Sequence, residues 1–587
     1  MLNRYYRDEL NYLKRQGREF AEGNPGLSRF LSERSTDPDV ERLLEGFAFL
    51  TGRLREKVED EFPELTHSLI GMLWPNYLRP VPSMTVMQFT PKWHALSATQ
   101  RIVRGTSLAS LPVDGTACRF RTCHDVALHP LEHVGVEAQH SREASVVALD
   151  LDVHSDQPLD ALGIDDLRVH LGGDGYTART LYLWLSHYLS RIELDIDGER
   201  QHLPKDCLRP VGFAESQGLL PYPRNAYQGY RILQEYLCFP EAFQFFDIAG
   251  LGKRLPARPG RRITLRLVFS RTLPADAKVR DEHLALYCTP AINLFEHDAD
   301  PIDLSGERSE YRLRPSSRNP AHYEVFSVDQ VSGWLAGESG KIRGEARDYV
   351  PFESFQHQIE RDRERNALYY RVRARESLRN DGFDHDIAFV RGDEQACLGL
   401  NETLSLKLTC SNRELPERLS VGDINVPSED SPAFADFRNI TRPTPALRPT
   451  LDGSLLWTLI SNLSLNYLSL LDRDALCSVL RAYDFRALID RQAERVSQLR
   501  LGGILSIETQ PIDRLHRGLP VRGLRSVLTL DQEAFGDEGG LYLFGSVLAR
   551  FFSLYASINS FHELHVINRH NRERYVWTSQ PGQQPLM

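Results

Sequence analysis

At 587 residues the chain is longer than a single hydrophobic core supports, so we expect about three to five domains. Its formal charge of -10, with lysine and arginine scattered among the acidic residues, argues against a nucleic-acid groove or an anionic membrane surface, because both need clustered basic residues. The eight cysteines form no CxxC pair, which favours reduced thiols, and the charged start MLNRYYRDELNYLKRQ is not a secretory signal. The expected compartment is the cytoplasm.

Residues 1–82 are predicted to form a helical N-terminal region. Asp37 and Pro38 supply an N-cap and a proline in the first helical turn. An apolar stripe at helical spacing follows, made of Val40, Leu43, Leu44, Phe47, Leu50, Leu54 and Val58. A helix of this kind is stable when its stripe packs against another helix, either in this chain or in a partner.

Between about residues 84 and 430 the sequence changes to short alternating runs separated by Gly, Pro and Asp. These runs are MTVMQF, RFRTCHDVAL, VVALDLDVH, IELDID, RITLRLVF, YYRVRAR and LSLKLTC. The alternation predicts strands of β-sandwich-like modules, interrupted by one helix near TLYLWLSHYLS. We assign a β-rich domain to 83–300 and a second to 301–440, and the proline-rich TRPTPALRP is predicted to be a stiff extended connector.

The last part, 441–587, is predicted to be an α/β domain. It contains the helical stretch GSLLWTLISNLSLNYLSLL, a helix around Ala475 to Tyr483, a strand pair at GILSIETQ and LRSVLTLD, and the long helix LYLFGSVLARFFSLYASIN. The fold class is therefore α+β and multidomain: an N-terminal helical region, central β-sandwich-like modules and a C-terminal α/β region with long helices.

The stretch GSLLWTLISNLSLNYLSLL is uncharged and long enough to span a bilayer. Its polar residues recur every fourth position, however, and would place the carboxamides of Asn462 and Asn466 at bilayer depth, where polar side chains are costly. We therefore predict a packed helix rather than a membrane span. Trp457, Asn462 and Asn466 are candidates for contact with a partner chain or another module.

The segment 219–251 carries eight aromatic residues. Aromatic stripes are more often core than binding groove, because each ring buries a large area in any fold. Two functional interpretations stay open beside the core one: a ligand cleft, possibly for sugars, and an obligate protein interface. Tyr230 and Phe243 from this segment, with Phe551 from the last long helix, are candidate partner-binding residues.

Three motifs resemble chemical sites without meeting their requirements. Cys118, Cys123, His124, His129 and His133 are zinc-ligand types, but in a strand Cys118 and His124 would lie about 20 Å apart. HELH at 562–565 is one residue short of the zincin motif HExxH, and GESGK at 337–341 lacks the first glycine and the magnesium-binding hydroxyl of a phosphate loop. We expect no catalytic residue, no metal and no cofactor.

Several longer segments resemble the TssF family, a baseplate component of the bacterial type VI secretion system. They include DPDVERLLEGFAFLTGRLREKVEDEFPELTHSLIGMLWPNYLRPVPSM, GYRILQEYLCFPEAFQFFDIAGL, CTPAINLFEHDADPI, NITRPTPALRP, WTLISNLSLNYLSLL and FGSVLARFFSLYASINSFHEL. They follow the order of the family from about residue 5 to residue 580. The resemblance implies a structural protein similar to a wedge subunit of contractile phage-tail baseplates, and not an enzyme.

The resemblance also implies partners. Two copies of such a chain would embrace one TssG-like chain, joined by TssE and by TssK, and the wedges would surround a VgrG hub on which the tube and the contractile sheath assemble. The protein would be cytoplasmic and docked at the inner membrane through the secretion complex, without inserting in it and without binding nucleic acid. The alternative from a different class is a carbohydrate-active enzyme that uses the aromatic segment 219–251 and two acidic residues.

Overall fold

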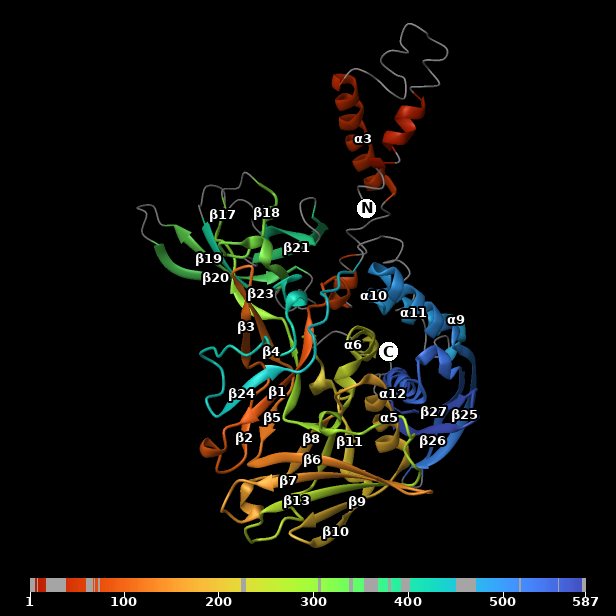
Figure 1. The fold of residues 1–587 in the computed structure, drawn as a ribbon. Helices are drawn as coiled ribbons and strands as arrows, with labels where there is room; N and C mark the ends of the chain where they lie inside the picture. The colour runs from red at the N-terminus through yellow and green to blue at the C-terminus, as the bar shows by residue number, and fades with distance from the viewer. Residues whose placement is uncertain are drawn as a thin grey trace. The chain divides into compact units, whose positions relative to one another are not determined.

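The fold is known from a computed structural model, shown in Figure 1. It describes residues 6–7, 9–16, 38–59, 67, 69–71, 74–222, 229–304, 308–336, 342–352, 368–377, 382–391, 402–449, 471–516, 519–557 and 559–582. Internal contacts divide the chain into two units. The first is Met1–Gly71 with Thr450–Leu463, and the second is Met72–Pro449 with Ser464–Met587.

The described part of the first unit is helical, as predicted. Its main element is α3 (Pro38–Glu59), which begins at the proline and carries Asp39 and Glu41 in its first turn, where the helix dipole favours acidic side chains. Lys14 of the preceding helix lies 3.6 Å from the Glu41 carboxylate. Helices at the N-terminus are therefore confirmed.

A five-stranded sheet in the second unit joins distant parts of the chain. Its order is β24-β1-β15-β4-β3, and its strands are β1 (Met84–Pro91), β3 (Ser107–Val113), β4 (Thr116–Thr122), β15 (Cys288–Ile292) and β24 (Ala435–Asn439). β1 pairs antiparallel with β15 on one side and with β24 on the other. Strands assigned from sequence to two separate domains, 83–300 and 301–440, thus belong to one sheet.

The proline-rich connector continues this pairing beyond β24. The Thr444 amide donates to the Met84 carbonyl at 2.8 Å, and Val81 and Leu447 exchange backbone hydrogen bonds at 2.7 and 2.9 Å. Prolines lack an amide hydrogen and favour extended backbone, so the segment can follow β1 while only some of its residues pair. The extended conformation predicted for TRPTPALRP is confirmed.

Two further antiparallel sheets follow β1 in the chain. The first has the order β10-β9-β13-β7-β6, with β6 (Leu131–His140), β7 (Ser145–Val153), β9 (Leu189–Ile196), β10 (Glu199–Leu203) and β13 (Arg262–Phe269). The second has the order β11-β12-β8-β14, with β8 (Asp166–His170), β11 (Leu208–Pro210), β12 (Phe245–Ala249) and β14 (Ala285–Leu286). A short pair joins β2 (Gln100–Ile102) to β5 (Val126–Leu128). The predicted helix is α5 (Gly175–Leu183), and it ends in a π-helical turn, Trp184–Tyr188.

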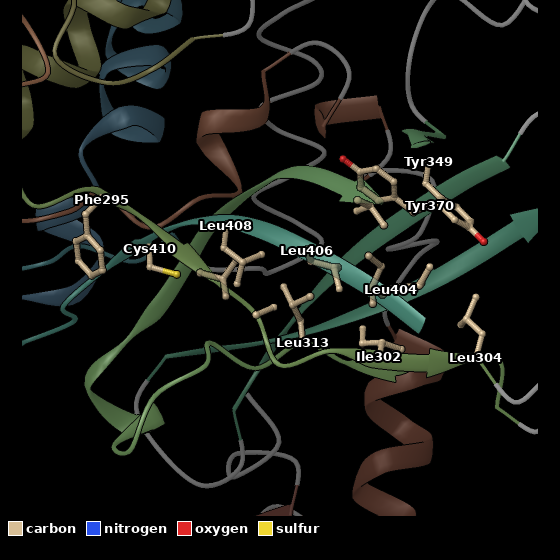
Figure 2. Close-up of a cluster of buried hydrophobic side chains, with 14 residues drawn as sticks. Phe295, Ile302, Leu304, Leu313, Tyr349, Tyr370, Leu404, Leu406, Leu408 and Cys410 are labelled. Carbon is tan, nitrogen blue, oxygen red and sulfur yellow. The ribbon is translucent and has the colours of Figure 1, made fainter. Parts of the chain in front are cut away.

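Residues 295–411 build the largest sheet and its own core. Its strands are β16 (Phe295–Asp298), β17 (Ile302–Leu304), β18 (Tyr311–Arg312), β19 (Glu324–Ala336), β20 (Ile342–Pro351), β21 (Leu368–Glu376), β22 (Phe383–Arg391) and β23 (Glu402–Ser411). Figure 2 shows Leu404, Leu406 and Leu408 of β23 in this core, all fully buried. β16 and β17 both pair with β23, so the sheet is continuous across the boundary that we placed at residue 300.

The C-terminal part is an α/β arrangement, as predicted. It contains α9 (Arg473–Tyr483), α10 (Phe485–Ile489), α11 (Arg491–Gly502), β25 (Ile504–His516), β26 (Leu519–Leu530), α12 (Glu538–Tyr555), β27 (Phe561–Asn568) and β28 (Arg574–Pro581). β26 and β27 are parallel, so α12 is their crossover connection. This helix is apolar almost all round because it contacts β27 on one side and α5 and α6 (Gly229–Cys238) on others (Figure 1).

A glycine allows the closest of these contacts. A Cβ on Gly539, in the first turn of α12, would lie 2.1 Å from the Arg179 carbonyl oxygen of α5. Arg179 in turn pairs with Asp537, whose other carboxylate oxygen accepts the Gly540 amide at 2.7 Å as the N-cap of α12. The start of the crossover helix is therefore fixed against the β-rich part of the chain.

An aromatic cluster ties the second unit together. Its members are Trp74, Tyr77, Tyr222, Tyr230, Tyr483, Phe485 and Phe551. The rings of Tyr230 and Tyr483 stack with centroids 4.7 Å apart, and Trp74 meets Tyr230 edge-on at 5.8 Å. Residues from opposite ends of the unit, including α6, α9 and α12, thus share one contact region.

We predict that Tyr230→Ala lowers the free energy of unfolding of the second unit by about 3 to 5 kcal/mol, the usual cost of truncating a large buried aromatic side chain. Chemical denaturation followed by tryptophan fluorescence measures it. Trp334→Ala is the matched control, because that ring is 41% exposed in β19. An equal effect of the two substitutions would contradict the central role of the cluster.

Candidate interaction surfaces

The structure describes three of the six residues that the sequence nominated for partner binding. Tyr230, Phe243 and Phe551 are all fully buried inside the second unit. They therefore form part of the chain's own core, which is the alternative left open for aromatic stripes. Contact with a partner stays a prediction for them, with no exposed surface to support it. Trp457, Asn462 and Asn466 lie outside the described residues.

The segment 219–251 forms core in its described part rather than a sugar-binding cleft. Its buried rings are Tyr230, Tyr236, Phe239, Phe243, Phe245 and Phe246. A carbohydrate site needs aromatic faces that a ligand can reach, and these faces are covered by neighbouring elements. Nothing in their geometry favours the enzyme alternative.

The same segment buries an ion pair. Arg231 and Glu235 lie one turn apart in α6, 2.8 Å from each other, and both are almost completely buried. Burial raises the pKa of Glu235, and this is opposed by Arg231 and by the Leu219 and Leu220 amides, which donate to the carboxylate at 2.8 and 3.3 Å. The pair holds the backbone at Leu219 and Leu220, so its role is architectural.

Two of the three histidines that resembled zinc ligands, His124 and His129, are held by protein groups. His124 Nε2 lies 2.8 Å from the Gln217 carbonyl, and His129 lies between the Thr99 hydroxyl at 2.8 Å and the Asp166 carbonyl at 2.9 Å. Among the described residues, no group of three or more His, Cys, Asp or Glu side chains could hold a metal ion. Burial lowers the pKa of His124 and of His129 to about 4, so both are neutral at pH 7.

The strand predicted across RFRTCHDVAL is wrong in its length. β4 ends at Thr122 and β5 begins at Val126, so His124 lies in the break between the two strands. The alternation of the run continues through this break, so the pattern predicts one long strand. HELH is strand β27, in which His562 and Glu563 point to opposite faces, and GESGK lies outside the described residues.

An exposed apolar row runs along α3. Leu43 is 73% exposed, Phe47 56% and Leu50 61%, and their i, i+4, i+7 spacing places them on one face of the helix. Ala48, on another face, is buried. Of the stripe expected from the sequence, the side chains of Val40, Leu54 and Val58 lie outside the description. We call Leu43, Phe47 and Leu50 the α3 row.

A second group of exposed apolar side chains lies on α10 and α11, and the sequence analysis did not predict it. Ile489 at the end of α10, with Val496 and Leu499 of α11, is about half exposed or more. The available signal was weak, since Val496 and Leu499 are only three residues apart among charged side chains. Large apolar side chains grouped on a surface mark sites of protein contact more often than isolated ones do.

No helix within the described ranges is long and apolar enough to cross a membrane. Residues 453–470, which make up most of the uncharged stretch GSLLWTLISNLSLNYLSLL, lie outside the described ranges. The packed-helix prediction for that stretch stays a prediction.

The whole chain is similar to proteins of one family. The family model "Type VI secretion system, TssF" matches residues 1–584. The Pseudomonas aeruginosa protein "Type VI secretion system component TssF1" is 32% identical over 622 aligned residues, which cover 99% of this chain and 98% of that protein.

Two solved structures have the same fold. A chain in the TssK-TssF-TssG baseplate subcomplex of the type VI secretion system aligns with a TM-score of 0.76 and 32% identity, covering 92% of this chain and 98% of that one. A chain in the baseplate complex of the same kind of system aligns with a TM-score of 0.70 and 28% identity over the full length of both.

The buried histidines generate a pH prediction. Because His129 has a pKa of about 4 in the folded chain and about 6.5 when unfolded, the unfolded chain binds the extra proton in between, and stability is lost as the pH falls from about 6.5 to 4. We expect His129→Gln to flatten this pH dependence by up to about 1.4 kcal/mol per pH unit. Denaturation at several pH values measures the slope, and the exposed His94→Gln should leave it unchanged.

Proposed function

Because this chain belongs to the TssF family of type VI secretion system proteins, we propose that it builds the baseplate wedge by binding TssG-like and TssK-like chains. The family is a structural baseplate component, and the chain is a structural subunit of that assembly. The relative in the TssK-TssF-TssG subcomplex supports the choice of partners. The finer parts of the proposal are the contact surfaces and the stoichiometry.

The α3 row is the observation that supports the proposal most directly. Three large apolar side chains on one helical face are more than half exposed in the isolated chain. Burying each of them in a partner stabilises a complex by about 1.5 to 3 kcal/mol. Their spacing is that of a helix–helix contact, in which residues at i, i+4 and i+7 pack into grooves of a facing helix.

We propose that a helix of the TssG-like chain, or of a second copy of this chain, covers the α3 row. An enzyme of this size would need a pocket with convergent polar groups, whereas an assembly subunit needs exposed apolar faces and a rigid core behind them. The patch of Ile489, Val496 and Leu499 would then give a second contact, on the other unit of the chain.

The remaining parts of the proposal rest on family membership. We propose that TssE and a VgrG hub join the wedge, that the sheath and tube assemble on it, and that it is docked at the cytoplasmic side of the inner membrane through the secretion complex. Repacking of discrete interfaces, rather than bending of the β-rich core, would let such a wedge change shape.

We expect the double variant Leu43→Asp with Phe47→Asp to weaken binding of the TssG-like chain at least about 100-fold, because two buried side chains together contribute about 3 kcal/mol or more. Co-purification of tagged chains and titration of the purified partner measure the loss. The side chains are exposed, so the fold should be retained, which circular dichroism checks.

Val421→Asp is the control for this variant, since Val421 is also more than half exposed but lies in a loop of the second unit. It should bind the partner like the wild type. Unchanged binding of the TssG-like chain by the Leu43 and Phe47 double variant would exclude that chain as the cover of the α3 row.

A separate prediction concerns stoichiometry. Native mass spectrometry of the purified wedge should give two copies of this chain for each TssG-like chain, as the family resemblance implies. A stable one-to-one complex under the same gentle conditions would overturn this ratio and leave the baseplate role intact.

A further inference from the structure

The C-terminal sheet has one face packed on α12 and one face turned away from it. His562 of β27 lies 5.1 Å from the Phe552 ring of α12, and the Trp577 indole of β28 donates to Ser546 of α12 at 3.1 Å. Side chains alternate along a strand, so Glu563 and Val576 point to the opposite face. We call this opposite side of β25–β28 the outer face.

A charged cluster lies on the outer face. Glu563 accepts hydrogen bonds from Arg525 Nε at 2.9 Å and from His565 Nε2 at 2.6 Å, and it pairs with Arg514. Arg574 donates to His565 Nδ1. Since a guanidinium can only donate, Nδ1 is the acceptor and the imidazole proton is on Nε2. Each of the four strands therefore supplies at least one member of the cluster.

The cluster carries more positive than negative charge. Burial raises the pKa of Glu563, but hydrogen bonds from Arg525 and His565 outweigh this and hold the pKa below its ordinary value. Burial and the neighbouring Arg574 lower the pKa of His565, although Glu563 opposes them. At pH 7 the cluster thus contains one carboxylate, a neutral imidazole and three guanidinium groups.

Burial separates the two signs of charge. The side chain of Glu563 is only 3% exposed, whereas that of Arg514 is 46% exposed and that of Arg525 33%. A molecule that approaches this cluster therefore meets guanidinium groups, while the Glu563 carboxylate lies beneath them. This is a local positive surface on a chain whose formal charge is -10.

An apolar side chain lies beside the arginines on the outer face. Val576, opposite His565 in the β27–β28 pair, is about half exposed. Nucleic acids and anionic lipid headgroups need a larger cluster of basic residues than these three arginines, whereas protein interfaces combine arginine with apolar contacts.

We propose that the outer face binds an acidic segment of a partner protein, whose carboxylates are received by Arg514, Arg525 and Arg574. Guanidinium groups bind carboxylates through paired, nearly parallel hydrogen bonds, which gives this surface both affinity and orientation. β25 is also the edge strand of this sheet, so part of its backbone has no neighbouring strand within the described residues. The proposal goes beyond the α3 row and does not depend on which chain covers that row.

The test uses the full chain and a fluorescein-labelled hexaglutamate peptide, titrated by fluorescence anisotropy. Arg514→Glu should weaken binding at least tenfold, because it reverses the charge of a side chain that is more exposed than that of Arg525. Glu563→Gln should strengthen binding, since it removes the carboxylate that competes with the peptide for the arginines. If the cluster has only a structural role, this substitution lowers the stability of the chain and does not raise its affinity for the peptide. Raising the salt concentration should weaken binding.

Arg522→Glu is the matched control, because Arg522 is exposed on the same strand as Arg525 but, at an even position, on the opposite face. It should change the affinity less than twofold. Equal losses from Arg514→Glu and Arg522→Glu, no binding of hexaglutamate by the wild type, or stronger binding to phosphatidylglycerol vesicles than to the peptide would each overturn the proposal. Melting temperatures of the variants confirm that they fold.

Discussion

Stacking of Tyr230 on Tyr483, with Trp74, Tyr77 and Phe551 around them, is the contact on which the second unit depends. These residues come from parts of the chain separated by hundreds of positions, so bringing them together costs conformational entropy. This cost grows only slowly with the length of the loop that is closed. Large rings recover this cost because each buries a wide apolar area and adds specific edge and stacking contacts. Closure of this cluster also fixes α6, α9 and α12 relative to one another.

The other fixed points of the second unit lie around that contact. Arg231 and Glu235 follow Tyr230 in α6 and form a buried ion pair, and the Tyr77 hydroxyl donates to the Ala482 carbonyl at 3.1 Å. Buried ion pairs add little net stability, but removing one partner is costly, so they favour a single arrangement over near alternatives. A core built in this way suits a protein that holds positions for other chains.

Surface chemistry differs from place to place on such a core. The α3 row is apolar and helical, whereas the outer face of the C-terminal sheet presents arginines above a buried carboxylate. Apolar contacts supply most of the affinity in an interface, and charged contacts add specificity and orientation. Two surfaces with different chemistry on separate units allow one subunit to bind different neighbours at the same time.

The amino-acid sequence by itself determined the local elements, because periodicity, caps and prolines act within a few residues. It predicted α3 from Pro38, the alternating strands β7 and β23, and the extended connector, and longer segments identified the family. Only the tertiary structure decided that β1 lies between β15 and β24, that Tyr230, Phe243 and Phe551 are core, and that Glu563 pairs with two arginines from neighbouring strands. A periodic pattern of apolar or charged residues shows that a helix or strand has an apolar or charged face. Which residues cover that face depends on parts of the chain far away in the sequence, and a single sequence does not specify those contacts.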